Sequence, residues 1–209
     1  MRRVNTNTAS IGLKSRTGRA IAVVLRGPAG SPQIIRRTEL VLTDRRVPET
    51  SQPYHEVMDL PWDEAQVAVR PFVSAVECVA VAALAKLVRE LESESVKVVG
   101  VGVVGSADRD LRKIGNPHIR AHAAEGVLFR QVLEAAAKAN GLAKRPFIER
   151  GFEECAAAEL GYSVTKLNGY LTRLGRAAGP PWRAEQRLAT MAAWVMLATY
   201  THAQVKKNQ

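Results

Sequence analysis

Two histidines and a glutamate stand at helical spacing in the middle of the chain. His118, His122 and Glu125 occupy positions i, i+4 and i+7. Because an α-helix turns by about 100° per residue, these positions lie within about 60° of one another on one face. Two imidazoles and a carboxylate on one face could bind a transition metal or act as a general acid and base. The sequence predicts a metal site at these three residues; alternatively, His118 hydrogen-bonds at the helix start and Glu125 pairs with a nearby cation.

The helix that carries these residues has recognisable ends. Asn116 can cap it, Pro117 suits the first helical position, and the Asn-Gly pair at 140–141 is typical of a helix end. Arg120 projects from another side, near the unpaired N–H groups of the first turn, which favour an anion such as phosphate. A further hypothesis is therefore an enzyme that acts on a small anionic substrate through His118 and His122.

An apolar run over residues 96–105 precedes this helix. It is almost continuous rather than alternating, which is typical of a strand covered on both faces in an α/β sheet. Open α/β sheets usually place their chemistry beyond the C-terminal ends of such strands. The run contains Gly-x-Gly-x-x-Gly, but inside the strand rather than after it. We expect its glycines to allow close packing of a helix.

The remaining elements follow from hydrophobic period and turn residues. Residues 1–9 are predicted to be disordered, and residues 10–205 to form a single domain. The predicted elements are strands at 11–13, 20–25 and 33–42, helical sequence at 62–92 broken near Pro71, a strand at 146–150, a helix at 152–160, a turn-rich loop at 175–181 and an amphipathic helix at 182–205. This order predicts an α/β fold with a mixed five-stranded sheet, three antiparallel strands followed by two parallel ones, flanked by helices.

That order of elements resembles the ribonuclease H-like superfamily, which includes RuvC-type resolvases and integrases. The resemblance covers about residues 10–205 and is carried by element order, not by a signature motif. It implies a nucleic-acid-binding protein and a metal-dependent, resolvase-like nuclease. In such nucleases Mg²⁺ or Mn²⁺ ions held between carboxylates activate a water and stabilise the transition state.

The resemblance also implies where the catalytic residues lie. The family pattern has an aspartate in the first strand, whereas this chain has Lys14. Acidic residues follow the next strands, at Asp108, Asp110 and Glu149, so these three and Lys14 are the candidate catalytic residues. Because a lysine would repel a metal ion, the alternative is a non-catalytic module. Its degenerate ribonuclease H-like site would bind a phosphate-containing ligand or a protein partner.

The net charge of +10 favours a polyanionic partner, nucleic acid first. Residues 1–50 carry ten Lys/Arg against three acids, and residues 96–150 carry ten against five, whereas residues 51–95 carry three against eight. The basic character therefore belongs to the first strands and to the segment around the central strand. The predicted nucleic-acid-binding residues are Lys14, Arg16, Arg19 and Arg120. The alternative is a solvated arginine-rich surface with no partner.

Two aromatic segments have both a functional and a structural interpretation. The loop at residues 52–55 reads Gln-Pro-Tyr-His, and binding groups concentrate in loops, but a proline-set turn with Tyr54 packed on the core explains it equally well. Trp182 stands among basic residues that would suit nucleic acid. It is most simply an anchor for the last helix.

Other features bound the location of the protein. Cys78 and Cys155, in apolar helical surroundings, are expected to be buried free thiols. No apolar run approaches the roughly eighteen residues of a membrane span, and no signal peptide is evident. A cytoplasmic location without a membrane partner is expected. Residues 191–197 are expected to be either core or the seam of a homodimer.

Overall fold

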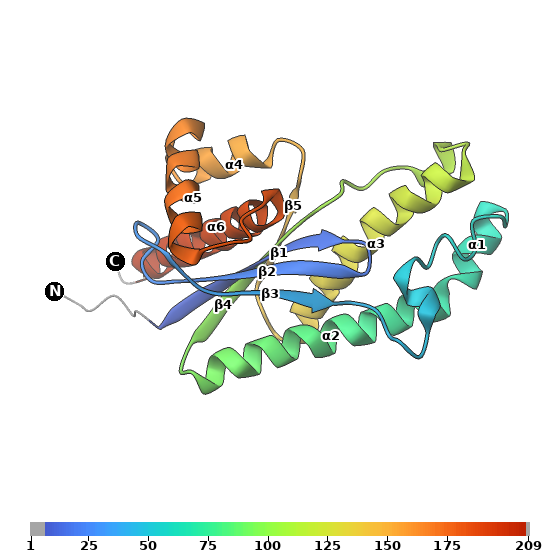
Figure 1. Ribbon diagram of the computed structural model, residues 1–209, viewed down its shortest axis with the longest axis horizontal. Coiled ribbons are helices and arrows are strands. Elements are labelled where there is room, and N and C mark those ends of the chain that lie inside the picture. The colour runs from blue at the N-terminus through green and yellow to red at the C-terminus, as the bar shows by residue number, and fades with distance from the viewer. Residues whose placement is uncertain (1–6, 208–209) are drawn as a thin grey trace.

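A mixed five-stranded sheet lies between two layers of helices in the computed structural model, which describes residues 7–207 (Figure 1). The strand order is β3-β2-β1-β4-β5. Strands β1, β2 and β3 are antiparallel neighbours, β4 is parallel to β1, and β5 is parallel to β4. The strands are β1 Thr8–Arg16, β2 Arg19–Arg26, β3 Gln33–Val41, β4 Lys97–Gly105 and β5 Lys144–Ile148. The predicted fold class is confirmed.

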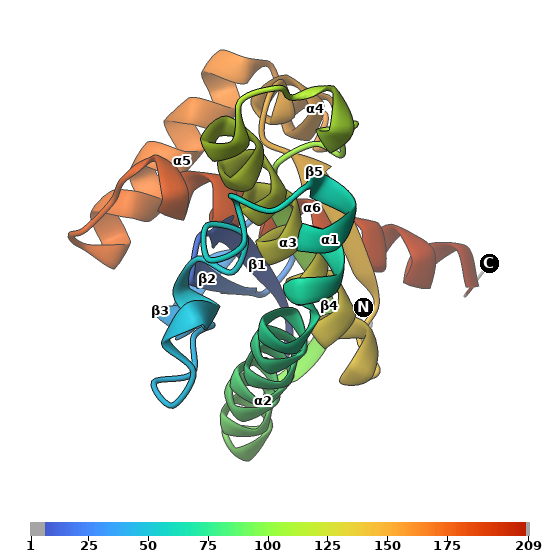
Figure 2. The same ribbon diagram turned by 90° about the vertical axis from the view of Figure 1, so that its right-hand side faces the viewer.

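Helices α2 and α3 cover one face of the sheet, and α6, with α4 and α5 outside it, covers the other (Figure 1). The helices are η1 Pro48–Ser51, α1 Trp62–Ala68, α2 Arg70–Ser93, η2 Leu111–Lys113, α3 Pro117–Ala139, α4 Phe152–Glu159, α5 Val164–Ala178 and α6 Ala184–Lys207. Strands β1, β4 and β5 end at the same edge of the sheet, which we call its C-terminal edge. Helix α3 begins at this edge, and Figure 2 looks onto it.

Three predicted boundaries were wrong. Strand β1 already includes Thr8 and Ala9, which the sequence predicted to be disordered, because both pair with β4. Residues 1–6 lie outside the described part of the chain. Strand β5 begins two residues earlier than predicted, and residues 175–178 belong to α5 rather than to a loop. Trp182 packs directly on Gly175 of α5 and against the core, so its predicted anchor role is confirmed.

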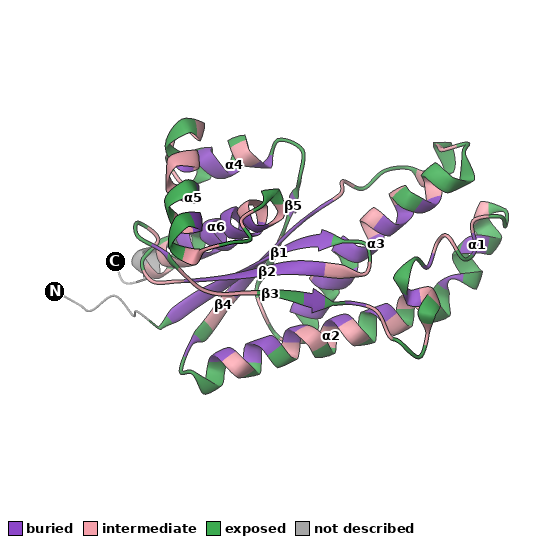
Figure 3. Ribbon diagram, viewed as in Figure 1, coloured by how far each residue is buried: buried purple, intermediate pink, exposed green. Residues whose placement is uncertain are grey.

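The middle of helix α6 is buried on all sides rather than amphipathic, which corrects the prediction for the last helix. Every residue from 189 to 198 is buried (Figure 3). The reason is its position: one side packs on β1, β2 and β4, and the other on α4. Residues 191–197 are therefore core of this chain and offer no seam for a homodimer.

Helix α2 lies at the margin of the fold, and its hydropathy and the position of its cysteine both bear on the predictions. Among the described residues it is the one helix long and apolar enough to cross a membrane by length and composition, a test that core helices of soluble proteins also pass. Its inner side packs on α3, β3 and β4. Cys78 projects from its outer side, and Cys155 is also exposed, so the prediction of two buried thiols was wrong. Both cysteines lie on the solvent side of their helices.

One arginine joins the third strand to the turn between α5 and α6. The guanidinium of Arg37 donates hydrogen bonds of 2.6–3.4 Å to the carbonyls of residues 178–181. We expect Arg37→Ala to lower the free energy of unfolding by about 2 kcal/mol, because several partly buried carbonyls lose a charged donor. The matched control is Arg36→Ala, whose partners are the half-exposed carboxylates of Glu90 and Glu94. It should cost less than about 1 kcal/mol in urea unfolding followed by circular dichroism; equal losses for both variants would contradict the expectation.

Candidate metal and nucleic-acid sites

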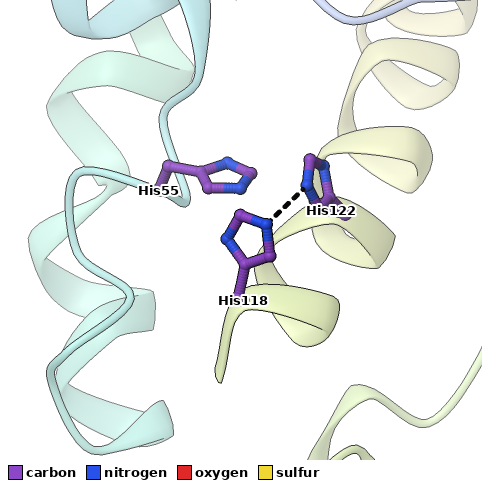
Figure 4. Close-up of side chains that lie close together, drawn as sticks. All are labelled: His55, His118 and His122. Atoms are coloured by element: carbon purple, nitrogen blue, oxygen red, sulfur yellow. Dashed lines mark hydrogen bonds between the residues drawn. The ribbon is translucent and has the colours of Figure 1, made fainter. Parts of the chain in front are cut away.

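Three histidines from two distant segments converge beside the C-terminal edge of the sheet (Figure 4). His118 and His122 lie in the first two turns of α3, and His55 lies in the loop between η1 and α1. The Nε2 atoms of His118 and His122 are 3.1 Å apart. The His55 ring centroid lies 5.0 Å from that of His118 and 4.4 Å from that of His122. One potential ligand atom from each residue lies within 4.8 Å of the others.

Glu125 stands behind His55 in this cluster. Its carboxylate is fully buried, and its Oε1 lies 2.8 Å from His55 Nδ1. Two buried polar atoms here have no hydrogen-bond partner, Glu125 Oε2 and His55 Nε2. The sequence placed Glu125 with His118 and His122 as a third ligand. In the structure Glu125 is fully buried behind His55, and His55 is the residue that completes the cluster with His118 and His122.

The start of α3 fixes the cluster on its helical side. Asn116 Oδ1 accepts a hydrogen bond from the backbone N–H of Ile119, so the predicted cap is confirmed. Because His118 and His122 are four residues apart, they lie one above the other on the exposed side of the first two turns. The cap thereby fixes the direction in which both rings leave the helix.

The loop that carries His55 is held by aromatic contacts. Tyr54 stacks on Trp62 with ring centroids 5.7 Å apart, and the Arg120 guanidinium lies 5.3 Å from the Trp62 ring centroid. Tyr54 also packs against the core, which was one of the two interpretations of this loop, and burial raises the pKa of its hydroxyl. Arg120 and Trp62 thus join α3 to the start of α1, which holds the preceding loop and its His55 against α3.

The centre of the C-terminal edge holds an ion pair where the resemblance implies a metal. Lys14 is 3% exposed, and its Nζ lies 3.0 Å from Glu149 Oε2 and donates to the carbonyl of Ser15 at 2.9 Å. The backbone N–H of Glu149 donates to the Gly105 carbonyl, which places this residue beside the end of β4. An ammonium group therefore lies where a divalent cation would have to bind.

The other predicted catalytic acids are also paired with cations. Arg130, 4% exposed, contacts the carboxylates of Asp108 and Glu134 and donates to the Ser106 carbonyl at 2.8 Å. Asp110 caps η2 by accepting from the Arg112 N–H and lies 3.6 Å from Lys113. A Mg²⁺ or Mn²⁺ ion between these carboxylates would have to displace the cations that pair with them, so their catalytic role stays a prediction.

The predicted nucleic-acid-binding residues differ in their availability. Lys14 is buried and bonded, and Arg16 and Arg19 are paired with carboxylates, chiefly Glu185 and Glu39. These pairs leave Arg16 and Arg19 partly exposed, so nucleic-acid binding by these two residues stays a prediction, whereas buried Lys14 has no surface to offer a phosphate. Arg120 is partly exposed and contacts Trp62 rather than a carboxylate.

A shallow pocket of about 330 Å³ lies between α1 and the loop that follows β4. Two of its lining residues are the exposed arginines Arg109 and Arg112, and the aromatic Trp62 forms another part of the wall. Arg112 pairs with Asp63 across an exposed surface, whereas Arg109 has no ion-pair partner within residues 7–204. These two arginines were not among the residues predicted from the sequence, although their position directly after β4 was an available signal.

Comparison with solved structures shows the ribonuclease H-like fold. Two structures of Thermus thermophilus RuvC, one of them in complex with a Holliday junction substrate, match 93% of this chain over 96% of their own. The TM-scores are 0.52 for the complex and 0.54 for the other structure, each at 8% sequence identity. No family model matches the sequence, and no curated protein matches it either. The likeness therefore establishes the fold.

Proposed function

We propose that this chain is a nucleic-acid-binding module of ribonuclease H-like fold that contacts phosphates at the C-terminal edge of the sheet. The observation that carries the proposal is the arginine pocket, which Arg109, Arg112 and Trp62 line together with Asp110 and which lies beside Arg120. Arginines bind phosphate through paired N–H donors, and the Trp62 ring, stacked on Tyr54, holds the Arg120 guanidinium beside the pocket. The net charge of +10 supports a polyanionic partner, and the complex of a structural neighbour with a Holliday junction is consistent with one.

The Lys14–Glu149 ion pair favours binding without catalysis at the sheet centre. A carboxylate pair is needed to hold a hard divalent cation, and here an ammonium group stands in its place. The proposed partner is DNA or RNA, which implies a location where nucleic acid is present, such as the cytoplasm.

The test measures binding and cutting in the same tubes. Labelled single-stranded, duplex and four-way-junction DNA and RNA are incubated with the protein in Mg²⁺ or in EDTA at two salt concentrations, then run on native and denaturing gels. We expect a salt-sensitive mobility shift that persists in EDTA, because phosphate contacts release counterions. No shift with any of these nucleic acids at low salt would overturn the proposal.

Removing the pocket arginines should weaken binding through charge. We expect Arg109→Ala/Arg112→Ala to lower affinity and, for duplex DNA, to reduce the slope of log K against log salt by about 1.8, since each phosphate contact contributes about 0.9. The matched control is Arg89→Ala/Lys138→Ala, which removes the same charge from exposed sites near the C-terminal ends of α2 and α3. If both double variants bind equally well, the arginine pocket is not the contact surface.

A second candidate function is a metal-dependent nuclease with its metal at the histidine cluster. The observation in its favour is the convergence of three histidines, with Arg120 in the same first turns of α3, although its side chain projects from another side onto Trp62. Cutting that disappears in EDTA and in His118→Ala/His122→Ala would establish it. A mobility shift without cutting would support the binding module instead of the nuclease.

A further inference from the structure

We propose that His55, His118 and His122 bind a transition metal ion of the Zn²⁺ class, with Glu125 as the carboxylate that orients His55. This site lies outside the sheet centre and differs from the Mg²⁺ or Mn²⁺ expected between carboxylates. The inference does not depend on nucleic-acid binding.

The distances fit three imidazole ligands. Two nitrogens bound to one tetrahedral ion at 2.0–2.1 Å are about 3.3 Å apart. The Nε2 atoms of His118 and His122 are already 3.1 Å apart, and the third ligand atom lies within 4.8 Å of both. Figure 4 shows the three rings turned toward one another. Small rotations of the exposed His118 and His122 side chains would bring the donors to bonding distance.

The buried groups behind the cluster favour a bound cation. A fully buried carboxylate is costly unless a positive group compensates it, and the hydrogen-bond partner of Glu125 in the structure is an imidazole. When Glu125 accepts the Nδ1–H of His55, the Nε2 atom of His55 carries the free lone pair, and this atom is buried without a partner. A cation bound at Nε2 would satisfy that atom and compensate Glu125 through the ring. This carboxylate–histidine–metal arrangement is the usual one for zinc-bound histidines.

The donor set determines the class of metal. Imidazole nitrogens suit Zn²⁺, Cu²⁺, Ni²⁺ and Fe²⁺, whereas Mg²⁺ and Mn²⁺ prefer oxygen ligands. Three protein ligands leave a fourth position, as in zinc sites that bind water or substrate. Because His118 and His122 are exposed, that position would open to solvent. The ion would also join the loop containing His55 to α3.

The test uses metal binding by the full-length protein, without nucleic acid. Protein stripped with EDTA and dialysed is titrated with ZnCl₂ and, separately, with MgCl₂ by isothermal calorimetry, and thermal unfolding is recorded with and without Zn²⁺. We expect one Zn²⁺ per chain, a rise in the unfolding temperature, and no saturable binding of Mg²⁺. Co²⁺ should give the absorption spectrum of a tetrahedral site.

Substitutions test which residues bind the Zn²⁺ ion. His118→Ala/His122→Ala, at exposed positions where the fold should be retained, is expected to abolish stoichiometric binding. Glu125→Gln should weaken it by about 10–100-fold. His202→Ala is the matched control, because His202 lies exposed on α6, in a different part of the fold, and its loss should change nothing. Absence of Zn²⁺ binding, or binding retained in the double variant, would overturn the site, whatever the gels show for nucleic acid.

Discussion

Gly12→Ala is expected to prevent the chain from reaching its native fold. A Cβ atom at residue 12 would lie 1.7 Å from the carbonyl oxygen of Ala189 and 2.7 Å from the backbone nitrogen of Ala193, both in α6. These are backbone atoms of a fully buried helix, so no side chain can move aside. Gly102, the register partner of Gly12 on β4, is similarly close to Ala192 of α6. The methyl group would have to lift α6 from the sheet.

The expected loss exceeds about 4 kcal/mol of unfolding free energy, because displacing α6 opens the packing around its whole buried segment. Urea unfolding followed by circular dichroism measures it. Gly30→Ala is the matched control, since its Cβ would meet no atom within 4 Å, and it should stay within about 1 kcal/mol of the parent. A Gly12→Ala protein as stable as the control would mean that α6 does not contact the sheet in this way.

This contact illustrates what local sequence signals can predict. The glycines of the central strand were predicted to allow close helix packing, and Gly102 under Ala192 confirms it. The order of strands and helices, the break near Pro71 and the cap at Asn116 were also predictable, because periodicity, proline and capping residues act within a few positions.

The candidate site depended on contacts that no local pattern contains. Glu125 meets His55 from 70 positions away, through a loop without periodicity, so the third histidine was recognised as a loop residue but not joined to the helical pair. Likewise Lys14 was seen as a departure from the family pattern. That Glu149 would pair with it could only be seen once β5 was placed beside β4.

Burial was also predicted incorrectly, because it too depends on contacts between distant parts of the chain. The segment 189–198 has apolar residues all round, and only the position of α6 between the sheet and α4 explains why every side is covered. Cys78 was expected inside because its neighbours are apolar, yet it lies on the outer side of α2. Hydrophobic period indicates the face of a helix only when one face is in fact exposed.

Lys14→Asp, which restores the acid expected in the first strand, should destabilise the fold by about 3–5 kcal/mol. The substitution removes a buried ammonium group, so Glu149 loses its cation. It also introduces a second carboxylate, at a position that is closed to solvent. Lys14→Met is the matched control. It keeps the unbranched apolar stem of the side chain without the ammonium group, and because the Glu149 side chain is 48% exposed, water can solvate the carboxylate that is left. We expect this control to cost about 1 kcal/mol.

Lys14→Asp also distinguishes a site that has lost its metal-binding geometry from a site that keeps this geometry and is blocked by Lys14 alone. If Mg²⁺ or Mn²⁺ restores the stability of Lys14→Asp and confers cutting of a branched DNA, the edge still holds the geometry of a metal centre and Lys14 alone suppresses it. We expect neither effect. Arg130 holds Asp108 and Glu134 in a separate cluster, so the new carboxylate at position 14 would join Glu149 without a third free acid. Two repelling carboxylates with no fixed third ligand would bind a hard cation weakly, so Lys14→Asp should not gain metal-dependent cutting.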